Sequence, residues 1–151
     1  MHKRPFRVLA VASGGGHWVQ LLRLRPAFAG CDVRYVTTKQ EYAKDVGDRV
    51  YVVTDANAWQ KLKVLRMFVE MAWVMARTRP EVVITTGAAP GFAAILFGRM
   101  FGAKTVWLDS IANSEELSNS GKMAGKWADV WLTQWPHLAR EAGPQCWGGV
   151  L

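Results

Sequence analysis

The sequence predicts an α/β fold in which helices cover both faces of a mainly parallel β-sheet. Short apolar runs alternate with helical patterns along the chain, and the runs are continuously apolar, as in strands that are buried on both sides. The 151 residues, 50% of them hydrophobic, suffice for one buried core. Because no linker or repeat interrupts this alternation, we expect a single Rossmann-like domain over residues 1–151.

Six apolar runs rich in β-branched residues predict the strands. In chain order they cover residues 7–12, 32–37, 49–53, 81–85, 104–108 and 129–133. Turn residues follow the first and fourth runs, at 13–16 and 86–91. Ligands of parallel sheets bind at the carboxyl ends of the strands. The loops after the first, fourth and fifth runs are therefore the candidate binding loops.

The intervening segments predict four helices, at about residues 17–25, 57–78, 92–101 and 121–127. Pro26 ends the first helix, and Asn57 is a suitable N-cap for the second. Pro90 lies close to the start of the third helix, where proline is tolerated, and Gly102 ends that helix. These signals place a helix after most of the predicted strands.

The predicted helix at 57–78 is apolar around most of its circumference. At about 100° per residue, Lys63, Arg66, Glu70 and Arg77 cluster within an arc of roughly 60–70°. A helix that packs on a sheet needs only an apolar stripe, so this helix should bury more than one face. Two interpretations stay open: a central core helix, or a helix that also lines a groove for an isoprenoid chain or lies in a membrane interface.

The loop Ser13-Gly14-Gly15-Gly16 joins the first strand to a helix that begins near His17. Glycines let a ligand approach the backbone, and a helix N-terminus offers free N–H groups to an anion. The dinucleotide fingerprint requires glycine where Val19 stands, and the P-loop requires Gly-Lys at Val19-Gln20, so neither motif is present. The loop is either a tight turn or a phosphate- or carboxylate-binding loop. His17 is either a general base or phosphate contact, or a ring that only packs.

Charge and cysteine content limit the classes of partner. Lys and Arg number 19 against 12 for Asp and Glu, giving a net charge of +7 that favours anionic partners. The two cysteines form no CxxC motif, so we expect neither a metal site nor a disulfide framework, and we expect a reducing compartment. No segment has the pattern of a secretory signal or of a membrane-spanning helix. Because no helix carries a concentrated basic stripe, nucleic acid is not an expected partner.

Three separated stretches together resemble the PssD family of bacterial polysaccharide biosynthesis. They are Ser13–Trp18, Thr85–Gly91, and Asp109–Leu138, the last of which includes Gln134-Trp135-Pro136. That family is similar to the membrane-anchor subunit of the eukaryotic UDP-N-acetylglucosamine transferase that makes dolichol-linked chitobiose. The glycine loop with its histidine is more distantly similar to that of MurG, the lipid-linked peptidoglycan glycosyltransferase.

The resemblance implies the N-terminal, acceptor-side half of a split GT-B glycosyltransferase, with a separate chain supplying the half that binds the UDP-sugar. The pair would transfer a sugar, with inversion, to a polyprenyl-diphosphate-linked saccharide in polysaccharide or glycan biosynthesis. The chain would act peripherally at the cytoplasmic face of the membrane and be inactive without its partner. No cofactor is implied, because helix dipoles and side chains would stabilise the leaving diphosphate.

The same resemblance assigns roles to individual residues. His17 is the first candidate for the base that deprotonates the acceptor hydroxyl, and Asp109 is the second. Acceptor or phosphate binding is expected of Ser13, Gly14, Gly15, Gly16, Thr86, Gly87 and Ser110. Gln134 and Trp135 are the expected partner-interface residues. Trp135 would either cover the sheet end or, with Trp147, help to form the seat for the partner domain. Membrane contact would come from surface helices and from basic residues, with candidates Arg23, Arg25, Lys61, Lys63 and Arg66.

Two alternative functions stay open beside this one. The first is a non-catalytic scaffold that brings a partner protein to the membrane. The second is a nucleotide-binding Rossmann protein that acts alone, against which the two missing nucleotide-binding motifs count.

Overall fold

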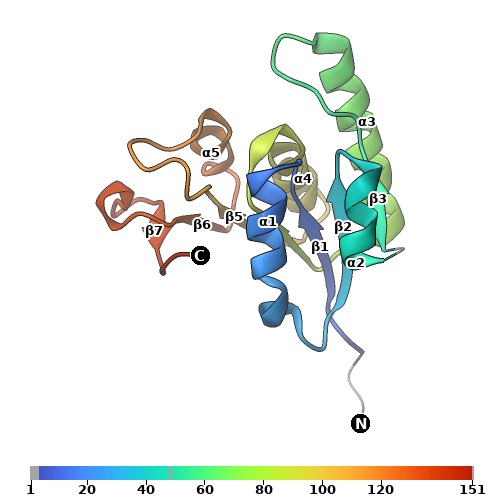
Figure 1. Ribbon diagram of the computed structural model, residues 1–151, viewed down its shortest axis with the longest axis horizontal. Coiled ribbons are helices and arrows are strands. Elements are labelled where there is room, and N and C mark those ends of the chain that lie inside the picture. The colour runs from blue at the N-terminus through green and yellow to red at the C-terminus, as the bar shows by residue number, and fades with distance from the viewer. Residues whose placement is uncertain (1–3, 48, 151) are drawn as a thin grey trace.

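The computed structural model describes residues 4–47 and 49–150, so the outermost residues of the expected 1–151 domain lie outside the described part. One seven-stranded sheet runs through the molecule in the order β3-β2-β1-β4-β5-β6-β7 (Figure 1). All six neighbouring pairs are parallel, which confirms the α/β prediction. The strands are β1 Arg7–Val11, β2 Asp32–Thr37, β3 Val50–Val52, β4 Val82–Thr85, β5 Lys104–Leu108, β6 Val130–Thr133 and β7 Gln145–Cys146.

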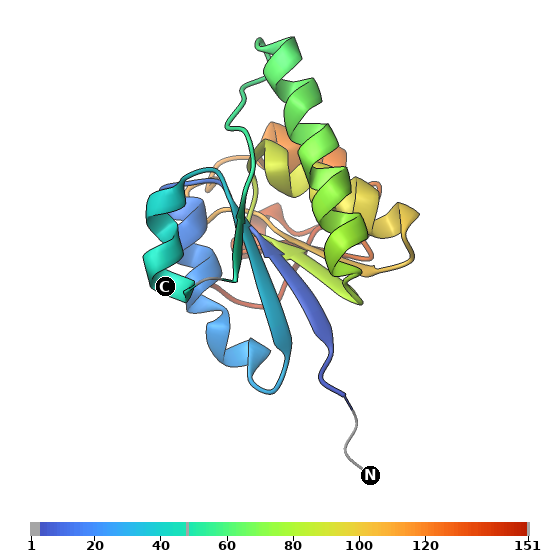
Figure 2. The same ribbon diagram turned by 90° about the vertical axis from the view of Figure 1, so that its right-hand side faces the viewer.

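The helices lie on the two faces of this sheet, with α1 and α2 on one side and α3 and α4 on the other (Figure 2). The α-helices are α1 Gly16–Arg23, α2 Ala43–Val46, α3 Lys61–Thr78, α4 Ala88–Met100 and α5 Asn119–Ala124. Short 3-10 helices are η1 Arg25–Phe28, η2 Gln40–Tyr42 and η3 Pro136–Leu138. None of these helices, within the described ranges, has the length and apolar content needed to cross a bilayer.

Alternate residues of the central strand β1 divide the core into two parts. Leu9 and Val11 face the methionines of α3, whereas Val8 and Ala10 pack with Trp18 and the rest of α1. Successive side chains of a strand point to opposite faces, so a continuously apolar strand supplies both cores at once. β1 is thus an interior strand between β2 and β4, and the glycine loop that follows it lies on the interior part of the carboxyl edge.

Helix ends differ from the predictions where local hydrogen bonds compete. α3 begins at Lys61 rather than at 57, because Asn57 Oδ1 accepts a hydrogen bond from Trp59 N (3.1 Å) and closes a turn before the helix. α4 begins earlier than expected, at Ala88, with Pro90 in its first turn. Ser118 Oγ accepts from Gly121 N at 2.9 Å and caps α5, which therefore starts earlier than predicted, at Asn119. The same helix ends at Ala124, three residues before the predicted end.

Helix α3 buries only one face, so the expectation that it buries several is wrong. Its buried residues are Met67, Met71, Val74 and Met75. The opposite side exposes an apolar stripe, hereafter the α3 stripe, in which the exposed fractions run from 59% to 84% and whose members are Leu62, Leu65, Val69 and Trp73. The sheet and α4 cover the other side of the helix, and the first turns of α3 project beyond the rest of the fold (Figure 2).

Candidate functional site

The three predicted binding loops meet at the carboxyl edge of the sheet, together with a fourth loop that follows β6. They follow β1, β4, β5 and β6, which are consecutive neighbours in the sheet. Hydrogen bonds join them: Thr86 Oγ1 donates to the carbonyl oxygen of His17 at 2.6 Å, and Gln20 Nε2 donates to Ser110 Oγ at 3.0 Å. Most candidate residues predicted from sequence therefore lie in one connected region.

His17, the second residue of α1, is held in a defined orientation. Its Nδ1 lies 2.9 Å from the backbone carbonyl oxygen of Thr86. Because a carbonyl oxygen can only accept, Nδ1 must carry the proton in this contact, which leaves a lone pair on Nε2 when the ring is neutral. The ring is half-buried, and Nε2 has no hydrogen-bond partner among the described residues. This tautomer is the one a general base requires.

Gly87 provides the space for that ring. A Cβ atom at this position would lie 2.8 Å from Cε1 of His17, and the backbone there has φ +132°. Both the close approach and the positive φ favour glycine. The glycine after β4 therefore supports the histidine after β1.

The glycine loop is open toward solvent. Gly15 has φ +65°, and Cβ atoms built at Gly15 or Gly16 would meet nothing within 4 Å. The first turn of α1 has no side-chain cap and no acidic residue, so its N–H groups can bind an anion. Gly14 and Ser13 lie half-buried at the start of the loop.

Tyr42 in η2 supports this loop from the side. Its hydroxyl accepts a hydrogen bond from Gly15 N at 2.9 Å, and its ring packs on Trp18. Sequence reasoning missed Tyr42, because the segment around η2 and α2 has no helical pattern long enough to predict an element.

Asp109 is buried and fully engaged. Its carboxylate accepts from Trp107 Nε1 at 3.0 Å, and from the hydroxyl and backbone N–H of Ser118 at 2.6 and 3.0 Å. Asn113 Nδ2 lies 3.4 Å away and donates as well. These contacts tie the end of β5 to the start of α5. The geometry favours a structural role for Asp109, whereas His17 Nε2 has no such partner among the described residues.

Gln20 and Gln134 form a buried amide pair beneath the site. Gln134 Nε2 donates to Gln20 Oε1 at 2.6 Å and to the Asp109 carbonyl at 3.1 Å, and Gln134 Oε1 accepts from Val150 N at 2.7 Å. Gln134 thus bonds within its own chain. Trp135 is half-buried and donates from Nε1 to the Ile111 carbonyl at 2.7 Å. Gln20, a buried polar residue, was missed, although its place one turn after His17 on α1 was a usable signal.

A mainly apolar groove lies beside these loops, between α3, α4 and α5. Its volume is about 630 Å³. We refer to it as the α3–α4 groove, lined by Ala56, Asn57, Ala58, Lys61, Val64, Phe68, Ala88, Ala89, Phe92, Asn119, Ser120 and Met123. Ala88 directly follows Gly87, so the groove begins next to the loop that supports His17.

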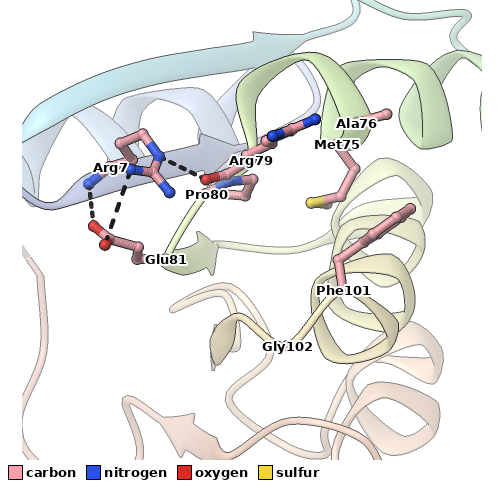
Figure 3. A pocket seen from close by; sticks show the side chains of 8 residues that line it. All are labelled: Arg7, Met75, Ala76, Arg79, Pro80, Glu81, Phe101 and Gly102. Carbon is pink, nitrogen blue, oxygen red and sulfur yellow. Dashed lines mark hydrogen bonds and ion pairs between the residues drawn. The ribbon is translucent and has the colours of Figure 1, made fainter.

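A second cavity of about 540 Å³ lies at the opposite, amino edge of the sheet (Figure 3). Arg7 bridges two of its other lining residues: Arg7 Nε donates to the Arg79 carbonyl at 2.7 Å, and Arg7 N donates to Glu81 at 2.9 Å. That backbone hydrogen bond, followed by the Arg4 side chain, lowers the pKa of Glu81. None of the predicted site residues lines this cavity.

The fold is that of one half of a GT-B glycosyltransferase. MurG from Acinetobacter baumannii superposes with a TM-score of 0.77 at 16% identity, over 93% of this chain and 47% of MurG. A putative UDP-N-acetylglucosamine 2-epimerase from Listeria monocytogenes gives a TM-score of 0.65 at 14% identity, over 91% of this chain and 40% of the epimerase. The chain therefore spans less than half of each of these proteins.

Sequence relatives agree with the expected family. The UDP-N-acetylglucosamine transferase subunit ALG14 of Eremothecium gossypii is 31% identical over 80 residues, which cover 49% of this chain and 36% of that protein. The family model described as "Oligosaccharide biosynthesis protein Alg14 like" matches residues 34–151. Because this match covers most of the chain, the chain belongs to the Alg14-like family of oligosaccharide biosynthesis proteins.

Proposed function

We propose that this chain is the acceptor-binding subunit of a two-chain inverting glycosyltransferase. Its reaction would move a sugar from a UDP-sugar to a polyprenyl-diphosphate-linked saccharide, with a separate GT-B chain binding the UDP-sugar. The observation that carries the proposal is the contact of His17 Nδ1 with the Thr86 carbonyl, which directs the Nε2 lone pair of the neutral ring to the carboxyl edge of the sheet. The curated relative's name, a transferase subunit, and the match to about half of MurG support the division between two chains.

The chemistry follows from this geometry. Nε2 of His17 takes the proton of the acceptor hydroxyl while that oxygen attacks the anomeric carbon, and the bond from that carbon to the UDP oxygen breaks on the opposite side. The Thr86 carbonyl then stabilises the imidazolium that forms, through the proton on Nδ1. General-base catalysis of this kind contributes about 10²- to 10⁴-fold in rate. The first N–H groups of α1, which no side chain caps, would bind the acceptor diphosphate.

The donor-binding subunit would dock at the carboxyl edge, over the loops after β5 and β6. Trp135 is half-buried there, and the exposed Trp147 lies near the C-terminal end of the described residues. Tryptophan suits interfaces because its large ring buries area at a small cost in conformational entropy. Gln134 would contribute to this interface indirectly, because its side chain bonds the Asp109 carbonyl and Val150 N and so holds the segments around Trp135 in place.

The α3 stripe would contact the membrane. Its apolar residues Leu62 and Leu65 neighbour Lys63 and Lys61, and each basic residue near anionic lipid contributes about 1 kcal/mol. Arg66 would contribute less to lipid binding, because it already forms an ion pair with Glu70 at 3.1 Å. An amphipathic helix of this kind lies in the interface plane. We propose peripheral contact with the cytoplasmic face, where the free thiols of Cys31 and Cys146 would stay reduced.

Reconstitution with the donor-binding subunit tests this function. Sugar transfer from a UDP-sugar to a polyprenyl-diphosphate acceptor is measured for each chain alone and for the mixture. We expect transfer only from the mixture. Full transfer by this chain alone would contradict the two-chain proposal.

A non-catalytic membrane scaffold is the second candidate, because the exposed α3 stripe is also what a scaffold needs. The His17→Ala variant separates the two functions. A scaffold keeps liposome binding and supports unchanged transfer in this variant, whereas the acceptor-binding subunit keeps liposome binding and loses transfer.

A further inference from the structure

We infer that the α3–α4 groove binds the first isoprene units of the acceptor lipid, next to its diphosphate. This inference rests on the proposed function, because it names where the hydrocarbon part of that acceptor lies.

The lining of the groove suits a hydrocarbon chain. Phe68 and Phe92 form an aromatic pair across it, with ring centroids 6.5 Å apart. Most of the other lining side chains are apolar as well, and the volume of about 630 Å³ is within the range of small-molecule sites. Burial of apolar ligand surface against such walls is favourable at roughly 25 cal/mol per Å².

One end of the groove lies beside the proposed catalytic centre. Ala88 and Ala89 line the groove and begin α4, directly after the Gly87 that contacts the His17 ring. A hydrocarbon chain in the groove would therefore bring its attached diphosphate to the loops after β1 and β4. The saccharide beyond that diphosphate would then lie near His17.

The opposite side of the groove continues into the α3 stripe. At about 100° per residue, Leu65 of the stripe lies roughly 40° from Lys61 and roughly 60° from Phe68 around the helix axis. Lys61 and Phe68 line the groove, whereas Leu65 is exposed. A chain that leaves the groove on this side meets the surface proposed to contact the bilayer.

Charge selects the occupant. Lys61 is on the lining, the lining includes no carboxylate, and Lys61 forms no ion pair within residues 4–47 and 49–150. The first turn of α4 has neither a side-chain cap nor an acidic residue. An apolar groove with an unpaired cation complements an apolar chain joined to an anion, which is the chemistry of an isoprenoid diphosphate.

Farnesyl diphosphate is a soluble probe for this site. Its affinity for the full chain is measured by titration calorimetry below the micelle concentration, beside dimethylallyl diphosphate and inorganic diphosphate. We expect farnesyl diphosphate to bind at least about tenfold more tightly than dimethylallyl diphosphate, since added carbons enter the groove.

A matched pair of variants locates the binding. Val64→Glu places a carboxylate in the groove, and Leu65→Glu places the same group on the neighbouring exposed stripe. We expect Val64→Glu to weaken farnesyl diphosphate binding at least about tenfold and Leu65→Glu to change it less than about twofold. Ala58→Trp narrows the groove from an exposed loop position and gives the same test without altering α3.

Several outcomes would overturn the inference. Equal affinity for inorganic and farnesyl diphosphate would mean an anion site without the groove. Unchanged farnesyl diphosphate binding in both Val64→Glu and Ala58→Trp would exclude the groove as the lipid site. If these variants lose only the binding of the donor subunit, the groove is a contact surface for that subunit instead. If farnesyl diphosphate binds as expected but the reconstituted pair transfers no sugar, the proposed function fails while the lipid site stands.

Discussion

The two edges of the sheet carry cavities of similar size and opposite chemistry. At the amino edge, both carboxylates are paired with arginines: Glu81 accepts from Arg4 at 2.6 Å, and Asp32 accepts from Arg49 at 2.9 Å (Figure 3 shows the Arg7–Glu81 contacts). At the carboxyl edge, His17 Nε2 has no partner among the described residues. Cavity volume therefore does not distinguish the two edges, whereas their polar groups do: carboxylates paired with arginines at the amino edge, and a histidine nitrogen open to a ligand at the carboxyl edge.

The direction of the helices explains this difference. In a parallel sheet the helices begin at the carboxyl edge, so α1 and α4 direct their uncapped N–H groups there. Their C-termini lie at the amino edge, where basic residues in the last turn complement the negative end of the dipole; Arg77 of α3 and Arg99 of α4 are examples. The fold itself thus places uncapped helix N-termini at the carboxyl edge, and helix C-termini with their basic residues at the amino edge.

Replacing His17 tests the contrast most strongly. We expect His17→Gln to lower kcat of the reconstituted enzyme by about 10²- to 10⁴-fold, because the amide cannot accept the acceptor proton. The thermal midpoint should stay near that of the parent chain. Arg79→Gln at the amino edge is the control and should leave turnover unchanged. Near-normal turnover of His17→Gln would remove His17 as the base.

Gly87 and Gly102 form a matched pair at the two edges. Both have positive φ, +132° and +82°, but a Cβ at Gly87 meets the His17 ring and one at Gly102 meets nothing within 4 Å. Alanine should strain the backbone at either site, by about 1–3 kcal/mol, but only Gly87→Ala should displace the ring. We expect turnover to fall by up to about 10²-fold in Gly87→Ala and to be unaffected in Gly102→Ala. Equal turnover in the two variants would contradict the support role of Gly87.

A substitution at Asp109 tests whether its carboxylate has a structural or a catalytic role. Asp109→Asn places an NH₂ group among donors and leaves at least one buried group unsatisfied, which costs about 1–3 kcal/mol of unfolding free energy. Urea unfolding should report this loss, while kcat per folded molecule stays close to that of the parent chain. Unchanged stability with lost turnover would instead make Asp109 the base.

Six strands were predictable because each forms a short run of apolar, mostly β-branched residues between turn or helix signals, a pattern that does not depend on tertiary contacts. β7 was not, since the two residues Gln145–Cys146 give no pattern. The pairing of His17 with Thr86 joins positions 69 apart in sequence, and only their shared place at carboxyl ends of strands brings them together. The partners of Gln20 and Asp109 depend on side-chain packing, which periodicity does not encode.

The long helix shows a further limit of pattern-based prediction. Its sequence correctly indicated an apolar circumference, yet Leu62 is 84% exposed. The sequence shows that a side chain is apolar, but it does not show whether the rest of the same chain, a second chain or a lipid covers that side chain. The sequence therefore predicted how much apolar surface α3 carries, but not that its own fold leaves the stripe uncovered.

Glu81 at the amino edge should give the smallest effect. Hydrogen bonds from Arg7 N and Arg4 hold its pKa below the ordinary value of 4.5, so its ionised form is favoured by folding. A lowered folded-state pKa adds stability that is present above pH 4.5 and is lost as the pH falls through the folded-state pKa. Glu81→Gln should therefore destabilise the chain slightly at neutral pH, and the difference should vanish in acid. Urea unfolding of both proteins across this range measures it, with turnover unchanged at neutral pH; a difference that persists in strong acid would show that the charge of Glu81 is not its source.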